Sequence, residues 1–301
     1  MTRVVLGAML VAAAMVAGGC RTQPGKPATG ATTPSVSRLP AYVDVAKAYN
    51  SHLEWIDRLY ASTTLRVWYP DKDGEEASDQ VEGQLNVDLP DRVALTFTKV
   101  GELYAILGCD PEQFWWIELG EAKRARVGRH AGATTDELRD AGLPVHPLDL
   151  AELLALVRLP EGEGGVGVGD GPRIAGGPDG AIVVTTPART GWRRLTLDPK
   201  TFEPRGVELL DRARKVVLTS TIDSMQPVLL RGAPTEPAAS PTIPRRVMVS
   251  VDGGRVRARL TIYSPESGGS RPKPAVFVMQ EWLKRYGVAE IIPFEANEAR
   301  P

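Results

Sequence analysis

Cys20 is the residue whose surroundings point most directly to a chemical role. It follows an apolar run, residues 4–17, that is shorter than the roughly 20 residues a helix needs to cross a bilayer. A basic residue, Arg3, precedes this run, and small residues at 17–19 separate it from the cysteine. This order is typical of a secretory signal and its cleavage site. We therefore expect residues 1–19 to be a signal peptide and Cys20 to be the first residue after it.

The segment Ala17-Gly18-Gly19-Cys20 resembles the lipobox of bacterial lipoproteins. The resemblance implies that the Cys20 thiol carries a diacylglycerol and that the chain is anchored to a membrane through two or three acyl chains. Arg21 stands where an aspartate would retain an enterobacterial lipoprotein in the inner membrane, so we expect an outer-membrane anchor that faces the periplasm. A plain secretory signal that happens to contain a cysteine is the alternative.

The lipidated cysteine and the residues after it, 20–40, form a section rich in Pro, Thr, Gly and Ser. Such a segment has little to bury, and a flexible chain of this length spans about 25 Å. We expect it to be a tether that lifts the folded part off the membrane. The remaining residues, 41–301, are expected to form a single domain, since all-β domains commonly reach this length.

The other candidates for chemistry are Cys109 and three histidines, His52, His130 and His146. Cys109 has no histidine or basic cluster beside it in the sequence, so we expect a structural thiol in a turn. If Cys20 is acylated, Cys109 has no partner for an internal disulfide. The histidines lack the spacing of paired metal ligands, so no metal site is expected.

Residues 162–167 read Gly-Glu-Gly-Gly-Val-Gly, which is literally a G-x-G-x-x-G motif. A dinucleotide site needs a strand before this motif and a helix after it, whereas here a helical pattern precedes it and turns follow. We interpret residues 161–180 as a flexible loop, with a lid over a cavity mouth as the functional alternative. The sequence contains no G-x-S-x-G elbow. We therefore expect that the protein binds no cofactor and is not an enzyme.

The composition indicates a globular protein without a nucleic-acid partner. Charged residues make up 24% of the chain and hydrophobic residues 43%, which is ordinary for a folded domain. The formal net charge is −1, so there is no electrostatic reason to expect binding to nucleic acid. The expected partner is a membrane, contacted through the lipid anchor.

The spacing of apolar residues predicts a few helices separated by antiparallel strands. Apolar residues three and four apart predict helices over residues 41–62, 147–159 and 274–287. Strict alternation predicts strands over residues 63–69, 83–89, 93–97, 102–108, 114–120, 181–187, 192–198, 205–211 and 215–223, and a hairpin over 245–263. The expected fold class is therefore α+β, mainly antiparallel β.

Two stretches resemble the LolA/LolB-like family of periplasmic lipoprotein carriers and acceptors: residues 82–97, EGQLNVDLPDRVALTF, and residues 195–211, LTLDPKTFEPRGVELLD. The order of elements over 41–263 is similar as well. The resemblance implies an incomplete β-barrel (a half-barrel) closed by helices, which binds a lipid or the acyl chains of another lipoprotein in traffic to the outer membrane. Acceptors of the family use a loop with an exposed leucine, where this chain has only Val100.

The apolar inner face of a half-barrel either encloses a cavity for acyl chains or is filled by core side chains. The candidate inner-face residues are Leu85, Val87, Val93, Leu95, Phe97, Trp116 and Leu197. A fully packed face is the alternative, and it would favour a non-enzymatic protein–protein interaction or envelope-sensing module. Trp115 and Trp116 are expected to point to opposite faces, because neighbours in a strand alternate.

Overall fold

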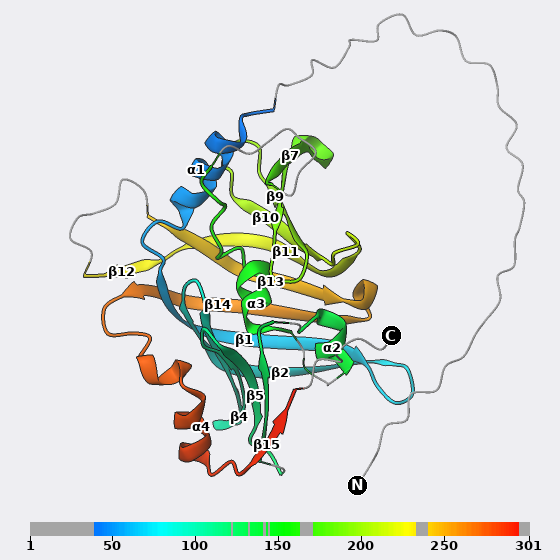
Figure 1. Ribbon diagram of the computed structural model, residues 1–301, viewed down its shortest axis with the longest axis vertical. Coiled ribbons are helices and arrows are strands. Elements are labelled where there is room, and N and C mark those ends of the chain that lie inside the picture. Colours follow the sequence, from blue (N-terminus) through cyan, green and yellow to red (C-terminus); the bar gives the residue numbers. More distant parts are fainter. Residues whose placement is uncertain are drawn as a thin grey trace, which may run out of the picture.

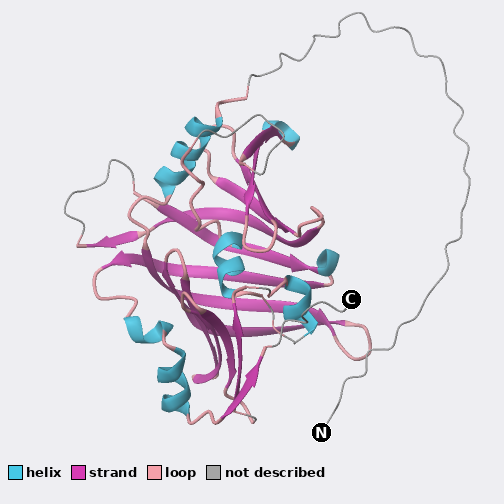
Figure 2. Ribbon diagram, viewed as in Figure 1, coloured by secondary structure: helices cyan, strands magenta, loops and turns pink. Residues whose placement is uncertain are grey.

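The computed structural model describes residues 39–121, 123–131, 133–140, 143, 145–162, 171–232 and 240–294. About half of these residues lie in one large sheet, and helices are few (Figures 1 and 2). The strands are β1 (Arg58–Pro70), β2 (Glu76–Asp88), β3 (Arg92–Lys99), β4 (Glu102–Cys109), β5 (Gln113–Glu118), β6 (Arg124–Arg129), β7 (Arg173–Gly176), β8 (Ile182–Pro187), β9 (Trp192–Leu197), β10 (Pro204–Leu210), β11 (Val216–Pro227), β12 (Leu229–Arg231), β13 (Thr242–Val251), β14 (Val256–Gly268) and β15 (Glu290–Pro293). The helices are α1 (Tyr42–His52), α2 (Thr135–Asp140), α3 (Pro147–Leu153) and α4 (Met279–Tyr286), with short 3-10 helices η1 (Pro178–Gly180), η2 (Asp252–Gly254) and η3 (Pro274–Phe277).

The sheet consists of two meanders joined through its longest strands. Its order is β15-β6-β5-β4-β3-β2-β1-β14-β13-β11-β10-β9-β8-β7, and β12 pairs separately with β14. Strand β1 pairs with both β2 and β14, and so connects the meander β1–β6 to the strands that follow. All these pairings are antiparallel except β15 with β6 and β12 with β14. The two end strands, β15 and β7, are not neighbours in this order, so the sheet is open.

The register places the predicted apolar positions on one face, which we call the inner face. Leu85 of β2 lies opposite Leu95 of β3, and Val87 lies opposite Val93. Because side chains alternate along a strand, all four point to the same side. The inner face packs against α1, α3 and residues 154–159, which together form one continuous core.

The opposite side, the outer face, is covered over β4–β6 by α4. Trp115 on β5 is fully buried there with Trp282 and Leu283 of the helix. Trp116 points to the inner face, so the two rings lie on opposite faces as expected. Helix α4 ends at Tyr286, and Gly287 follows as a left-handed cap with a φ of 64°.

All three predicted helices are shorter than expected, and the third begins at Met279, with η3 over residues 274–277. The first ends at His52 rather than at residue 62, because the chain turns at Trp55, with a φ of 68°, and β1 begins at Arg58. Strand β1 is hydrogen-bonded on both sides, and this pairing outweighs the local helical pattern. The second ends at Leu153 rather than at residue 159, just before a positive φ of 51° at Ala155.

The prediction of a structureless loop over residues 161–180 is wrong for the part that the structure describes. Residues 173–176 form β7 and residues 178–180 form η1. Residues 163–170 lie outside the described residues, as do the predicted signal and most of the tether, residues 1–38. Strands β6, β12 and β15 and helix α2 were not predicted either. Among the described residues, no helix has both the length and the hydrophobicity needed to cross a membrane.

Candidate functional site

The seven predicted inner-face residues gather in the structure around one core. Leu85, Val87, Val93, Leu95 and Phe97 come from β2 and β3, and Leu197 comes from β9 of the other meander; all six are buried in the same cluster. Trp116 is only partly buried, and its ring packs edge-on against Phe97 with centroids 5.5 Å apart. The inner face at these positions is filled by protein side chains.

Helix α3 lies across the inner face in front of the sheet (Figure 1). It contacts β3 and β4 of the first meander and β10 of the second. Its residues Leu150 and Leu153, with Leu154 just after it, belong to the inner-face core. This short helix therefore bridges the two meanders, and its position depends on what holds its ends.

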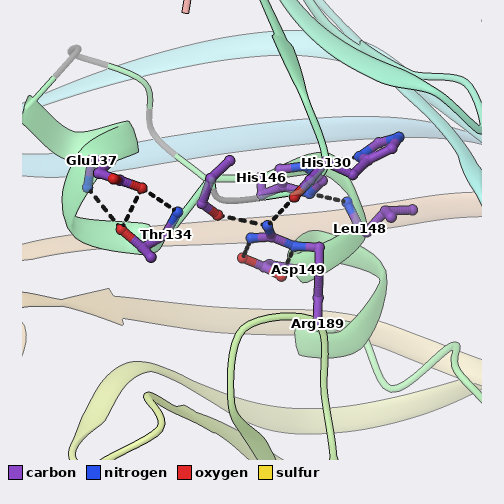
Figure 3. A network of polar contacts seen from close by, with 8 residues as sticks. His130, Thr134, Glu137, His146, Leu148, Asp149 and Arg189 are labelled. Carbon is purple, nitrogen blue, oxygen red and sulfur yellow. Dashed lines mark hydrogen bonds and ion pairs between the residues drawn. The ribbon is translucent and has the colours of Figure 1, made fainter. Parts of the chain in front are cut away.

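A chain of hydrogen bonds holds the start of α3 to the first meander (Figure 3). Nδ1 of His146 accepts from the backbone N–H of Leu148 at 3.1 Å, so its proton is on Nε2, which donates to Nδ1 of His130 at 3.1 Å. Nε2–H of His130 then donates to the carbonyl of Asp110 at 2.6 Å. This arrangement requires both rings to be neutral. Burial, with help from Arg189 and His130, holds the pKa of His146 well below its ordinary value.

Arg189, in the turn between β8 and β9, attaches the same helix to the second meander (Figure 3). Its guanidinium donates to both carboxylate oxygens of Asp149 in α3, at 3.1 and 2.7 Å. It also donates to the carbonyl of Ala133 at 2.6 Å. A bidentate ion pair of this kind determines the orientation of α3 as well as its position.

A second buried arginine supports the far end of α3. Arg193 of β9 has only 2% of its side chain exposed and donates to Glu152 at 2.5 Å and to the carbonyl of Val157 at 2.9 Å. Burial raises the pKa of Glu152, and the charge of Arg193 opposes that rise. Ser220 of β11 also donates to the carbonyl of Leu153 at 2.7 Å. Both ends of α3 are thus held by polar contacts that reach through the core.

These polar contacts were missed by sequence reasoning. His130 and His146 were considered only as metal ligands, and the arginines were not considered at all. One signal was present: Arg193 occupies an inward position of β9, in alternation with Leu195 and Leu197, where an apolar residue would be expected. A charged side chain that points into the core needs a buried partner, because an unpaired buried charge is energetically costly.

The described residues cover part of the inner face only incompletely. Its apolar character continues along β1, β2 and β13 toward the turns that join β1 to β2 and β13 to β14, and the side chains there are only partly buried. We call this region the apolar rim; its residues are Leu65, Val67, Val81, Val249 and Val251. Leu65 lies opposite Val81, while Val67 and Val249 flank Ala258 of β14, so the rim is continuous across adjacent strands. Tyr69, beyond Val67 on the same face, is exposed.

A separate hollow of about 640 Å³ lies among β7–β11, lined in part by Arg194, Thr196, Glu208 and Thr219. Arg194 and Thr196 alternate with the inward Leu195, so this hollow opens on the outer face. None of the seven predicted cavity residues lines it. The predicted cavity residues and this hollow are therefore on opposite sides of the sheet.

The surroundings of Cys109 indicate a structural role. Cys109 is the last residue of β4 rather than part of a turn, and it is buried in the inner-face core. Burial raises the pKa of its thiol to about 12, and its S–H donates to the carbonyl of Asp91 at 3.5 Å. In the described part of the chain, no group of three or more metal-ligating side chains comes together. Val100, in the turn between β3 and β4, is 97% exposed.

Comparison with known proteins gives structural relatives only. No protein-family model matches the chain, and no curated protein matches its sequence. A domain from Vibrio parahaemolyticus described as an outer membrane lipoprotein-sorting protein has a TM-score of 0.51 and 13% identity, covering 81% of this chain and 98% of that one. A LolA superfamily protein from Nitrosomonas europaea has a TM-score of 0.48 and 11% identity, covering 80% of this chain and 99% of that one.

Proposed function

We propose that this chain, whose fold is similar to that of the lipoprotein-sorting domain from Vibrio parahaemolyticus, binds a hydrophobic ligand on the inner face of its sheet. The ligand class is a lipid or the acyl chains of another lipoprotein. The observation that carries the proposal is the apolar rim, where the inner face continues past α3 with partly exposed aliphatic side chains on three strands. Each methylene of an acyl chain that the rim removes from water contributes about 0.8 kcal/mol.

In this proposal the sheet is a half-barrel and α3 is the helix that closes it. An acyl chain first lies along the rim, against Leu65 and Val249, and its deeper end reaches Phe97 and Trp116. Further entry requires α3 to move, because its leucines occupy the space over the core. The protein acts as a non-enzymatic binder in this proposal, which is supported by Asp149, Glu152 and His146, described buried groups that all hold the helix.

The rest of the proposal concerns the N-terminus. Removal of residues 1–19, acylation of Cys20 and a tether over 20–40 would place a single domain, residues 41–301, at the periplasmic side of the outer membrane. The described residues begin at 39, next to α1, so the tether would join the domain beside this helix. A role in lipid or lipoprotein traffic to that membrane fits both the anchor and the fold.

Native mass spectrometry tests ligand binding. The mature chain, residues 20–301 with Cys20→Ser to prevent acylation, is incubated with a fatty acid or an acylated peptide and examined without detergent. We expect bound ligand for this chain, and loss of most of it in Val249→Glu, which puts a charge into the rim. The matched control is Ser250→Glu, the next residue along β13, whose side chain points to the outer face.

A packed interaction or sensing module is the second candidate, favoured by the complete burial of six of the seven predicted cavity residues. It predicts no uptake of either ligand by the unmodified chain. Equal loss of ligand in Val249→Glu and Ser250→Glu would also contradict the rim as the binding site.

A further inference from the structure

The outer face carries an unusual group of side chains near the turn between β1 and β2. Three guanidinium groups surround one indole: the central carbons of Arg66, Arg259 and Arg257 lie 5.0, 5.1 and 5.9 Å from the ring centre of Trp68. The register explains the grouping, because Arg66 lies directly opposite Arg259 and Trp68 directly opposite Arg257. We call these four residues the arginine–tryptophan cluster.

The charges of this cluster are only partly balanced by the protein. Arg257 forms an ion pair with Glu76 of β2. Arg66 donates to the hydroxyl of Ser78 at 3.1 Å, and neither Arg66 nor Arg259 has an ion pair within the described part of the chain. Nε of Arg259 is buried without a hydrogen-bond partner. Two like charges directly opposite each other on adjacent strands are unfavourable unless something stabilises them.

The indole stabilises these cations in part, and it does not use the N–H groups that remain after the contacts to Glu76 and Ser78. A guanidinium that packs on an aromatic ring keeps its in-plane donors available for an anion, and its fork of N–H groups matches the oxygens of a phosphate. Tryptophan itself is enriched at the level of lipid headgroups, where its ring is partly in apolar and partly in polar surroundings. Arginines and tryptophan together therefore fit the phosphates of a lipid surface.

We propose that the arginine–tryptophan cluster is a docking surface for the phosphate headgroups of anionic phospholipids. Docking takes place through the outer face of β1 and β14. The neighbouring turn carries three carboxylates, Asp71, Asp73 and Glu75, and an anionic surface repels them. The outer face of the sheet therefore lies toward the lipid, and the turn lies away from it. The inner face with its apolar rim stays free in this orientation. The inference goes beyond the proposed ligand binding, since it uses the opposite face.

Vesicle sedimentation tests the docking surface with the same chain, residues 20–301 with Cys20→Ser. The vesicles contain either phosphatidylcholine alone or phosphatidylcholine with phosphatidylglycerol. We expect binding only to the phosphatidylglycerol vesicles, and its loss in about 1 M salt, where the Debye length is about 3 Å. The double variant Arg66→Gln/Arg259→Gln should bind about thirty-fold more weakly, since each basic residue contributes roughly 1 kcal/mol at an anionic surface.

The matched control removes the same two charges elsewhere. Arg205 and Arg231 are surface arginines paired with Asp198 and Glu266, so Arg205→Gln/Arg231→Gln changes the net charge equally without touching the cluster. Equal weakening in both double variants, or equal binding to both kinds of vesicle, would overturn the proposal. Arg66→Gln/Arg259→Gln should keep its uptake of fatty acid in native mass spectrometry, because both side chains point away from the rim, so the two proposals fail separately. Circular dichroism of each variant checks that the sheet is intact.

Discussion

At the scale of single residues, His146 shows how a buried ring becomes sensitive to pH. Both of its nitrogens are engaged, one as acceptor from Leu148 and one as donor to His130. A second proton on the ring would face the N–H of Leu148, with the positive charge of Arg189 nearby. The folded state therefore keeps His146 neutral, whereas the unfolded chain takes up a proton as the pH falls through about 6.5.

We predict that the free energy of unfolding contains a histidine contribution that is fully present above pH 6.5 and is lost as the pH falls below it. The pKa of His146 is lower in the folded than in the unfolded state, so acid favours unfolding, by up to about 1.4 kcal/mol per pH unit. Urea unfolding at pH 7.5 and 5.5 measures the difference. His146→Asn, which keeps a good N-cap residue, should flatten this dependence. The same slope in His146→Asn as in the unmodified chain would refute the assignment.

At the scale of elements, α3 is too short to be stable by itself, since isolated helices need about 12 residues or more. Its stability comes from tertiary contacts, apolar ones to the core and polar ones to Arg189 and Arg193. The free energy needed to desolvate these charged groups offsets much of their attraction, so the polar contacts mainly determine where α3 lies. The same reasoning explains why the helix ends at Leu153: Ser220 and Arg193 bind the carbonyls of Leu153 and Val157, where a longer helix would use its own N–H groups.

Removal of Arg193 should therefore destabilise the protein strongly. Arg193→Ala leaves Glu152 buried without its partner, and we expect a loss of about 3–5 kcal/mol in the free energy of unfolding. Arg193→Met/Glu152→Leu, which removes both charges, should recover much of that loss. The comparison variant is Arg205→Ala, which breaks an exposed pair with Asp198 and should lower the free energy of unfolding much less. Losses of similar size for Arg193→Ala and Arg205→Ala would show that the buried pair does not hold α3.

At the scale of the whole molecule, one core connects both meanders, so exposure of its centre requires the structure to open. Cys109 lies in this core at the end of β4 and is fully buried. With Cys20 replaced by serine, it is the only thiol in the chain. Its reactivity therefore reports opening of the core.

We predict that Cys109 does not react with a thiol reagent at pH 8 in the native protein. Two causes act together: the side chain is inaccessible, and burial raises the pKa of its thiol to about 12, so almost no thiolate is present. Reaction should become fast in urea, with a midpoint equal to that of unfolding followed by circular dichroism. Arg193→Ala, which loosens α3, should increase the native labelling rate. Fast labelling of the unmodified native chain would contradict the packed inner face.

The sequence by itself determined that the sheet is mainly antiparallel and which face is buried in the strands that it predicts. The alternation of apolar and polar residues is a local property of each strand. It can be recognised around Leu85 and Leu95 without knowing how their strands pair. Glycines stand at two positions with a positive φ, Gly74 in the turn between β1 and β2 and Gly287 after α4, and glycine adopts this conformation easily. The predicted signal and lipobox at Cys20 are local patterns too, and they stay predictions.

The tertiary structure alone decided where helices end and which distant residues meet. Helical spacing continues past His52, but β1 gains hydrogen bonds on both sides by starting at Arg58. His130 meets His146, and Arg66 meets Arg259, only because separate elements become neighbours in the fold. Whether the inner face is filled or open was likewise undecided, since alternating apolar residues are compatible with both. The answer depends on where α3 packs, and contacts far apart in the chain determine that position.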